Sequence, residues 1–153
     1  MTGEKKLIDR QLNGLAGEYF VAAQLLKRGM LASVTMGNAK ALDLFCYNPD
    51  TDRTFNVQVK TLRYVNCFPM KKESIKAGHV YVFVMLNKDG EQEQFFLVQG
   101  RTILKDINRF YGSCYTREKP PTVPAINSGS LKPFEDNWKI FDRNIKKSAE
   151  QGD

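Results

Sequence analysis

Three polar side chains are expected to share one face of a short hairpin in this chain of 153 residues. The segment FNVQVKT, residues 55–61, alternates apolar and polar residues as a half-buried strand does, which places Gln58 and Lys60 side by side. The preceding segment ALDLFCY, residues 41–47, carries Asp43 among apolar residues. Carboxylate and amide oxygens bind hard divalent cations, and an ammonium group stabilises developing negative charge. Such a set of side chains suits the binding of a metal ion and an anionic substrate.

The length of the hairpin loop decides whether these side chains meet. A four-residue loop at 49–52 places Asn48 opposite Arg53 and, five pairs farther along, Asp43 opposite Gln58. The two Cβ atoms would then lie about 4.5–5.5 Å apart on one face of the sheet. A loop that is one residue shorter or longer would place Asp43 opposite a valine and separate the polar groups.

A second carboxylate interrupts a predicted helix. Apolar residues recur at helical spacing over residues 6–28, and Gly29 follows where a C-capping glycine is expected. Glu18 lies in the apolar stripe of this helix, where a carboxylate needs a partner. Gly14 and Gly17 each cost roughly 1 kcal/mol relative to alanine inside a helix. They therefore predict the close approach of another backbone or a later start of the helix.

Each of these polar residues also has a purely structural explanation. Glu18 and Lys60 could form an ion pair between helix and sheet. Asp43 could accept hydrogen bonds from a turn or strand, since leaving it buried and unpaired would cost several kcal/mol. Gln58 could serve only as a cross-strand hydrogen-bonding partner. The residue types alone leave these alternatives open.

The order of the polar residues resembles that of the PD-(D/E)xK nuclease superfamily, the restriction-endonuclease-like and Holliday-junction-resolvase-like proteins. The superfamily pattern is a Glu in the first helix, an Asp in the second strand and Glu-x-Lys in the third. Here Glu18, Asp43 and the QVK segment at 58–60 stand in that order, and the resemblance covers about residues 12–61. It implies an α/β (α+β) fold with a restriction-endonuclease-like αβββαβ core, in which a central mixed sheet is flanked by helices.

The resemblance also implies hydrolysis of DNA phosphodiester bonds with Mg²⁺ or Mn²⁺ as the cofactor. A hard divalent cation can shield the phosphate charge, activate a water molecule and support the leaving oxygen. By resemblance, Asp43 is the principal metal ligand, Glu18 binds directly or through water, and the carbonyl of Val59 completes the protein's share. Lys60 would orient the attacking water and stabilise developing negative charge.

Two positions depart from the superfamily pattern. Leu42 stands where a proline would precede Asp43, and Gln58 stands where Glu or Asp is usual. The Gln58 amide oxygen can still bind a hard cation, but the site loses one negative charge and therefore some metal affinity. Certain homing endonucleases of the superfamily resemble this chain in having Gln there. Three functions stay open: a metal-dependent DNA endonuclease, a catalytically inactive nuclease-fold module that binds nucleic acid, and an unrelated basic α/β interaction domain.

The charge of the chain favours a polyanionic partner. Lys and Arg number 23 against 17 Asp and Glu, a formal net charge of +6, and residues 1–80 carry most of the excess. The basic residues expected to contact DNA flank the polar cluster: Lys40, Arg63, Lys71, Lys72 and Lys76. Tyr64 and Phe68 lie among them and could either stack on bases or belong to the core. A solvated basic surface is the simpler alternative.

The rest of the sequence predicts one nuclease-like domain over residues 1–153. Strands are expected at 31–36, 42–48, 54–61, 79–86 and 93–99, and a second helix at 101–111. The strand at 79–86 is apolar on both faces, which is typical of a sheet interior. Residues 112–133 are rich in Pro, Gly, Ser and Thr and predict a long surface loop. An aromatic-rich segment after the loop is expected to dock on the core, and 148–153 to form a frayed tail.

Composition excludes several other classes. The three cysteines lie too far apart for a zinc site and are odd in number, so neither a disulfide framework nor a metal knuckle is indicated. No signal-peptide pattern and no apolar run long enough to cross a bilayer is present, so a cytoplasmic protein without a membrane partner is expected. A homodimer is compatible with the nuclease hypothesis, because two sites are the simplest way to cut two strands.

Overall fold

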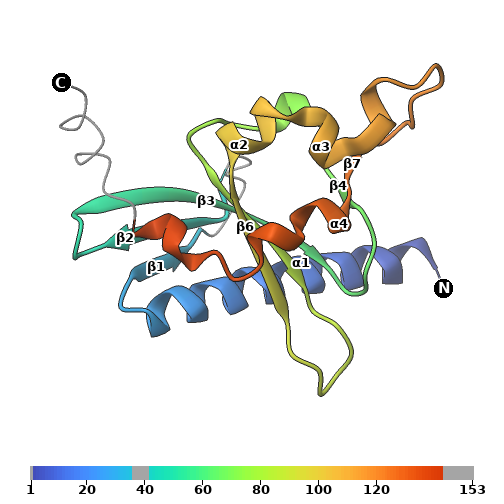
Figure 1. Cartoon of the computed structure of the whole chain (residues 1–153). Coiled ribbons are helices and arrows are strands. Elements are labelled where there is room, and N and C mark those ends of the chain that lie inside the picture. Colours follow the sequence, from blue (N-terminus) through green and yellow to red (C-terminus); the bar gives the residue numbers. More distant parts are fainter. Residues whose placement is uncertain (1, 36–41, 143–153) are drawn as a thin grey trace, which may run out of the picture.

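A mixed five-stranded sheet forms the centre of the computed structural model, which describes residues 2–35 and 42–142 (Figure 1). Its strands are β1 Leu31–Val34, β2 Leu44–Asn48, β3 Arg53–Leu62, β5 Val80–Met85 and β6 Gln94–Gln99. They lie in the order β1–β2–β3–β5–β6, with β3 and β5 parallel and the other neighbours antiparallel. The α-helices are α1 Gly3–Lys27, α2 Gly100–Lys105, α3 Ile107–Tyr111 and α4 Ser128–Leu131. The predicted α/β class with a mixed sheet is confirmed.

Short elements complete the described chain. A second, two-stranded sheet pairs β4 Phe68–Pro69 with β7 Ala125–Ile126. Single turns of 3₁₀-helix are η1 Lys72–Ser74, η2 Gly112–Tyr115, η3 Lys132–Phe134 and η4 Trp138–Phe141. Among the described residues, none of the helices is both long enough and apolar enough to cross a membrane.

Helix α1 lies along one face of the sheet and begins three residues earlier than its apolar spacing predicts, which excludes the later start considered for its glycines. Gly29 follows its end with φ +80°. The N–H groups of Gly29 and Met30 donate to the carbonyls of Leu26 and Leu25, which is a Schellman motif. Glycine adopts this positive φ without strain, so its predicted C-capping role is confirmed.

The hairpin of β2 and β3 has the predicted register. Asn48 pairs with Arg53, and the ladder continues as far as Leu44 opposite Val57. The connecting loop turns through Asp52, which has φ 52°. Because the register is that of a four-residue loop, Leu44 and Cys46 of β2 point to α1 together with Val57 and Val59 of β3, and Gln58 and Lys60 lie on the opposite face.

Two apolar layers cover the two faces of the sheet. One packs α1 against β3 and β5 through residues such as Leu25 and Val57. The other packs α2 and α3 against β5 and β6 through residues such as Phe83 and Ile103. Every residue of β5 is buried, as predicted for an interior strand.

The second layer does not reach β2. Phe45 on this face is 48 % exposed, whereas Phe83, two strands away, is fully buried. Gln58 and Lys60 project from the same face of β3 and are partly exposed. The sheet therefore presents an open strip beside its covered half, and the polar side chains lie on that strip.

Two helical predictions need correction. Asp106 separates α2 from α3, and its carboxylate accepts a hydrogen bond from the N–H of Arg109, so it caps the second helix. The predicted helix at 101–111 is therefore two short helices. The αβββαβ pattern implies a helix between the parallel strands β3 and β5, but the only helical element there is the turn η1, which follows the short strand β4.

The prediction of a plain surface loop at 112–133 is wrong. This segment contains η2, β7 and α4, and it buries Ile126 and Leu131. These two apolar side chains let a segment rich in Pro, Gly and Ser pack on the core. The docking predicted for the aromatic-rich segment is confirmed by three buried residues: Trp138, Ile140 and Phe141. The tail at 148–153 lies outside the described residues.

Candidate metal and nucleic-acid site

Helix α1 approaches β3 closely at Gly17. A Cβ atom added there would lie 2.9 Å from the Cβ of Thr61 and closer still to its Oγ1. Gly17 therefore allows a close approach, although the approaching group is a side chain of β3 rather than backbone. Gly14 has no such neighbour within 4 Å. The contact at Gly17 brings the next residue, Glu18, to the strands that carry the other polar residues.

Asp43 lies where the β2–β3 ladder ends. Its N–H donates to the carbonyl of Val57 at 3.2 Å, and its Oδ2 accepts a hydrogen bond of 2.7 Å from the N–H of Val59. Strand β2 begins only at Leu44, so Asp43 is not a regular ladder partner of Gln58. The register still brings the residue before β2 to this point of β3. There the Asp43 carboxylate accepts the hydrogen bond of the Val59 N–H in place of a strand carbonyl.

Glu18 and Asp43 lie close enough for their charges to repel. Burial raises the pKa of Glu18 above its ordinary value, and the Asp43 carboxylate raises that pKa further. Neither carboxylate forms an ion pair within the described residues, where the single ion pair joins Arg63 to Asp89. A bound cation would offset this unbalanced negative charge.

Gln58 and Lys60 share the open face of β3. Their side chains are partly exposed, while the intervening Val59 is buried on the α1 side. In the part of the chain that the structure describes, neither the Gln58 amide nor the Lys60 ammonium has a hydrogen-bond or ion-pair partner. The structure thus shows neither an ion pair from Glu18 to Lys60 nor a cross-strand hydrogen bond from Gln58.

Val59 presents its backbone to the end of β2. Its N–H donates to Asp43, and the two backbone groups of a strand residue point toward the same neighbouring strand. Because β2 begins after Asp43, the Val59 carbonyl faces the edge beyond the regular ladder. This is the carbonyl that the superfamily resemblance assigns to the metal.

The available donors suit a hard cation. They are two carboxylates, one amide oxygen and one backbone carbonyl, all of them oxygen atoms. Within residues 2–35 and 42–142, no group of three His, Cys, Asp or Glu side chains could hold a metal ion. The candidate site has only two such side chains, Glu18 and Asp43, because Gln58 stands where a third acid is usual. The set fits Mg²⁺ or Mn²⁺ with several retained waters better than it fits a closed metal site.

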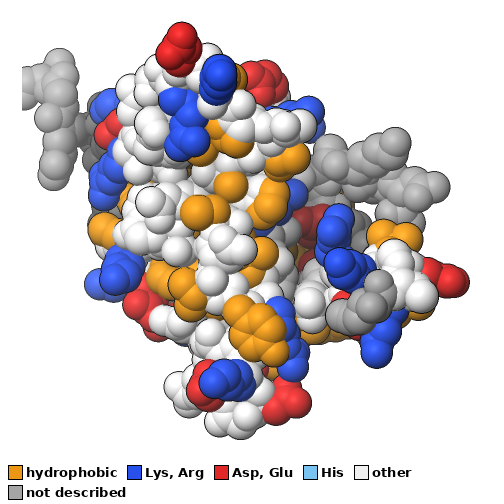
Figure 2. Space-filling view, turned by 90° about the vertical axis from the view of Figure 1, so that its right-hand side faces the viewer, with side chains coloured by type: hydrophobic (Ala, Val, Ile, Leu, Met, Phe, Trp, Pro, Cys, Tyr) orange, Lys and Arg blue, Asp and Glu red, His pale blue; other side chains and the backbone are white. Residues whose placement is uncertain are grey.

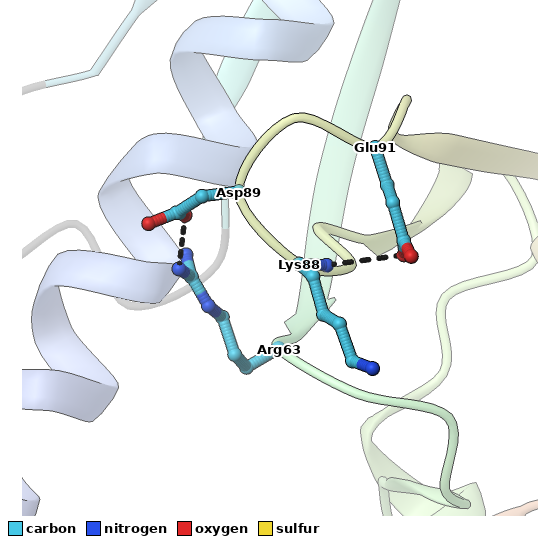
Figure 3. Close-up of polar contacts among 4 residues, drawn as sticks. All are labelled: Arg63, Lys88, Asp89 and Glu91. Carbon is cyan, nitrogen blue, oxygen red and sulfur yellow. Dashed lines mark hydrogen bonds and ion pairs between the residues drawn. The ribbon is translucent and has the colours of Figure 1, made fainter.

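Arg63 follows the end of β3, three residues beyond Lys60. Its guanidinium forms an ion pair of 2.7 Å with Asp89, in the turn between β5 and β6 (Figure 3). The two side chains are 39 % and 94 % exposed, so the pair is weak and open to exchange. Arg63, Tyr64 and Asn13 line an open groove between α1 and the end of β3. A polyanion that entered this groove could replace Asp89 as the partner of Arg63.

The other basic residues predicted to contact DNA lie on the connection between β3 and β5 or outside the described chain. Lys71 and Lys76 are exposed, and the ammonium of Lys72 lies 4.4 Å over the ring of Tyr115. No hydrogen bond or ion pair joins these three side chains to the site within the described residues. Lys40 lies in the part of the chain that is not described.

Basic and apolar side chains meet at the end of the molecule toward which the N-terminus of α1 points. Figure 2 shows Lys and Arg side chains around a band of hydrophobic side chains on this face. Phe68 is 1 % exposed and belongs to the core, whereas Tyr64 is 61 % exposed. Of the two aromatic residues considered for stacking on bases, Tyr64 is therefore the accessible one.

The fold of this chain is similar to that of a solved nuclease structure. The bacterial homing endonuclease I-Ssp6803I aligns with 92 % of this chain and 97 % of its own, with a TM-score of 0.59 and 14 % identity. The chain has a restriction-endonuclease-like fold, that of the PD-(D/E)xK nucleases.

A second restriction-endonuclease-like structure is less similar. The Holliday junction resolvase Hjc from Archaeoglobus fulgidus aligns with 90 % of this chain and 95 % of its own, with a TM-score of 0.46 and 14 % identity. No protein-family profile and no curated protein matches the sequence. At these identities the likeness concerns the fold.

Sequence reasoning missed three features of the candidate site. The Val59 N–H anchors Asp43, Asp89 pairs with Arg63, and Thr61 fills the space opposite the helix glycine. The Thr61 Oγ1 is buried without a hydrogen-bond partner among the described residues. Of these features, only the close contact at Gly17 was indicated by the sequence, through a glycine inside a helix. The spacing of residues predicts the face that a side chain occupies but not the group that it contacts.

Proposed function

We propose that this chain is a divalent-metal-dependent endonuclease that hydrolyses phosphodiester bonds of DNA. The observation that supports this function is the convergence of Glu18 and Asp43, whose charges repel, beside the unpartnered side chains of Gln58 and Lys60. Repelling carboxylates and unpaired polar groups cost stability, so their presence in one place favours a functional role. The similarity in fold to a bacterial homing endonuclease adds support.

The proposed roles are those that the superfamily resemblance implies, and the contacts of Asp43 support the first of them. Asp43 is the principal metal ligand, because the hydrogen bond from Val59 occupies one carboxylate oxygen and orients the other. Glu18 binds directly or through water, and the Gln58 amide oxygen and the Val59 carbonyl supply the remaining protein ligands. Lys60 orients the attacking water and stabilises developing negative charge. When bound, Mg²⁺ or Mn²⁺ lowers the pKa of a water molecule and neutralises phosphate charge.

DNA is the proposed partner of a single nuclease-like domain spanning residues 1–153. Arg63 beside the site is the proposed phosphate contact nearest the chemistry, and Lys71, Lys72, Lys76 and Lys40 would add attraction from farther away. Each phosphate contact releases counterions, so binding should weaken as salt rises. The excess of positive charge over residues 1–80 supports this assignment.

A catalytically silent module that binds nucleic acid is the second candidate. Gln58 favours it, because the amide leaves only two carboxylates for the metal. The retained Glu18, Asp43 and Lys60 favour catalysis, since a module that only binds has no need for a repelling pair of acids. The two candidates differ in one outcome, which is whether the phosphodiester bond breaks.

A plasmid nicking assay with Mg²⁺ or Mn²⁺ tests the proposal. The wild-type chain should convert supercoiled plasmid to open-circular or linear DNA, and Lys60→Met should slow this conversion at least about 100-fold. The matched control is Lys105→Met, which changes an exposed lysine of α2 and should keep full activity. Undiminished cleavage by Lys60→Met would contradict the assigned site. Salt-sensitive binding without cleavage by the wild-type chain would select the silent module.

A further inference from the structure

The outward face of α1 carries an apolar stripe that the fold itself does not use. The stripe consists of six positions: Ile8, Leu12, Leu15, Tyr19, Ala23 and Leu26. Its five large side chains are between 45 % and 58 % exposed. Spacings of three and four residues place all six on one side of the helix, as in the seam of a coiled coil. The side that contacts the sheet is formed by other residues: Gly17, Val21, Ala22 and Leu25.

Charged residues avoid this stripe. Over residues 11–26, Glu18 is the only charged residue, and it belongs to the site on the sheet side. A surface helix with one apolar face normally carries charged and polar residues on the opposite face. An apolar stripe on both sides of α1 therefore indicates that both sides are covered in the functional protein.

We propose that the outward face of α1 binds a second copy of this chain, with the two α1 helices antiparallel about a two-fold axis. A symmetric contact requires a surface that complements itself. When the axis passes between Leu15 and Tyr19, Ile8 faces Leu26 of the partner subunit and Leu15 faces Tyr19 of the partner subunit. The stripe spans the 19 residues from Ile8 to Leu26, about 27 Å of continuous helix contact.

The flanks of the stripe complement each other in the same orientation. Leu12 would face the small Ala23 of the partner subunit, so that a large residue meets a small one. Asp9 and Lys27 are five helical turns apart and lie on the same flank of α1. Antiparallel pairing brings Asp9 beside Lys27 of the partner subunit at both ends of the contact. It also opposes the two helix dipoles, which a parallel pair would align.

The mass of the chain in solution tests the contact and does not depend on nuclease activity. We expect sedimentation equilibrium to give twice the chain mass of 17.5 kDa. Leu15→Lys should raise the dimer Kd at least about 100-fold, because it places a charge in the centre of the seam. The matched control is Val123→Lys, which changes another exposed apolar residue outside α1 and should leave the Kd unchanged.

Circular dichroism separates loss of pairing from loss of folding. Leu15→Lys should keep the helical signal of the wild-type chain, since Leu15 does not belong to the buried core. A wild-type chain that is monomeric at high concentration would overturn the proposal. A dimer that survives Leu15→Lys unchanged would place the contact elsewhere and overturn it as well.

Disulfide cross-linking tests the antiparallel orientation. In a background with Cys67→Ser, which removes an exposed thiol, Ile8→Cys and Leu26→Cys chains are mixed and oxidised with oxidised glutathione. The antiparallel contact predicts a covalent dimer in the mixture and none from the Ile8→Cys chain alone. A parallel contact predicts self-linking of the Ile8→Cys chain, and that result would overturn the orientation.

Discussion

The Asp43 carboxylate accepts a hydrogen bond of 2.7 Å from the backbone N–H of Val59. The bond lies where the regular β2–β3 ladder ends. The backbone of β3 therefore orients the acidic side chain of the residue that directly precedes β2. It uses Oδ2 and leaves Oδ1 without a hydrogen bond in the described part of the chain. A ligand held in place before its metal arrives loses less conformational entropy on binding.

Substitution at Asp43 should separate metal binding from structural support. Asp43→Asn keeps an oxygen that can accept from Val59 but removes the charge, so cleavage should fall at least about 100-fold while stability changes by less than about 1 kcal/mol. Asp43→Ala removes the acceptor too and should lower the free energy of unfolding by about 1–3 kcal/mol. Nicking assays and urea unfolding measure the two effects. Equal stability of both variants would show that the Val59 bond contributes nothing.

Restoring an acid at position 58 should strengthen metal binding. Gln58→Glu adds a third carboxylate to the ligand set, and we expect the Kd for Mn²⁺, measured by calorimetry, to fall about 10-fold. Asn56→Glu is the matched control, because it adds the same charge two residues earlier on the same face of β3. It should lower the Kd less than Gln58→Glu does, since a side chain about 6.6 Å farther along the strand adds charge near the ion but no direct ligand. Equal effects of both variants would refute a ligand role for residue 58.

The raised pKa of Glu18 predicts a pH dependence. Since the pKa is higher in the folded than in the unfolded chain, ionised Glu18 costs folding free energy, and the cost disappears as the pH falls through the folded pKa. Metal binding requires the ionised form. As the pH is lowered, metal affinity should therefore begin to fall at a higher pH than it would with an ordinary glutamate. Asp43→Asn should lower the pKa of Glu18, although burial keeps it raised. Carbon-13 NMR titration of the Glu18 carboxyl measures each shift.

Removing the charge of Glu18 should stabilise the metal-free protein. Glu18→Gln removes a partly buried charge and its repulsion from Asp43, and thermal unfolding at neutral pH should show a gain of less than about 1 kcal/mol, because solvent screens the group. Added Mn²⁺ should stabilise the wild-type chain more than this variant, which keeps Asp43 but lacks one carboxylate of the ligand set. A lower melting temperature for metal-free Glu18→Gln would contradict the repulsion.

The two glycines inside α1 should respond to substitution in opposite directions. Gly17→Ala places a Cβ against Thr61, so it should destabilise the fold by about 1–3 kcal/mol and displace the neighbouring Glu18. Gly14→Ala meets nothing within 4 Å and should stabilise the helix by up to about 1 kcal/mol. Urea unfolding of the two variants provides the comparison. Similar stability of both variants would show that the Thr61 side chain can move aside without lowering the free energy of unfolding.

Much of the fold follows from alternation and spacing. The four-residue loop predicted the β2–β3 register, and that register put Gln58 and Lys60 on the face away from α1. The apolar spacing of α1 predicted that Glu18 lies on the sheet side, where burial and then the Asp43 carboxylate raise its pKa. Each of these predictions needs only the period of an element and one turn. The metal-ligand roles of these residues stay predictions.

Other features depended on contacts between distant segments. The departure of Asp43 from the ladder is set by how two strands diverge, which no periodicity encodes. The fold of 112–133 depends on Ile126 and Leu131, two apolar residues in a segment whose composition is typical of a loop. Asp106, by contrast, is a good N-capping residue, and it could have predicted the break between α2 and α3.

Helix α1 should tolerate little sequence variation. Its inner side needs Gly17 without a side chain, Glu18 beside it is assigned to the site, and its outer side carries the stripe proposed to pair with a second copy. An ordinary surface helix is free to vary along its solvent side, where most substitutions change stability by less than about 0.5 kcal/mol. In a saturation library selected for cleavage, the middle of α1 should therefore resemble a buried helix, with substitutions rejected around its whole circumference.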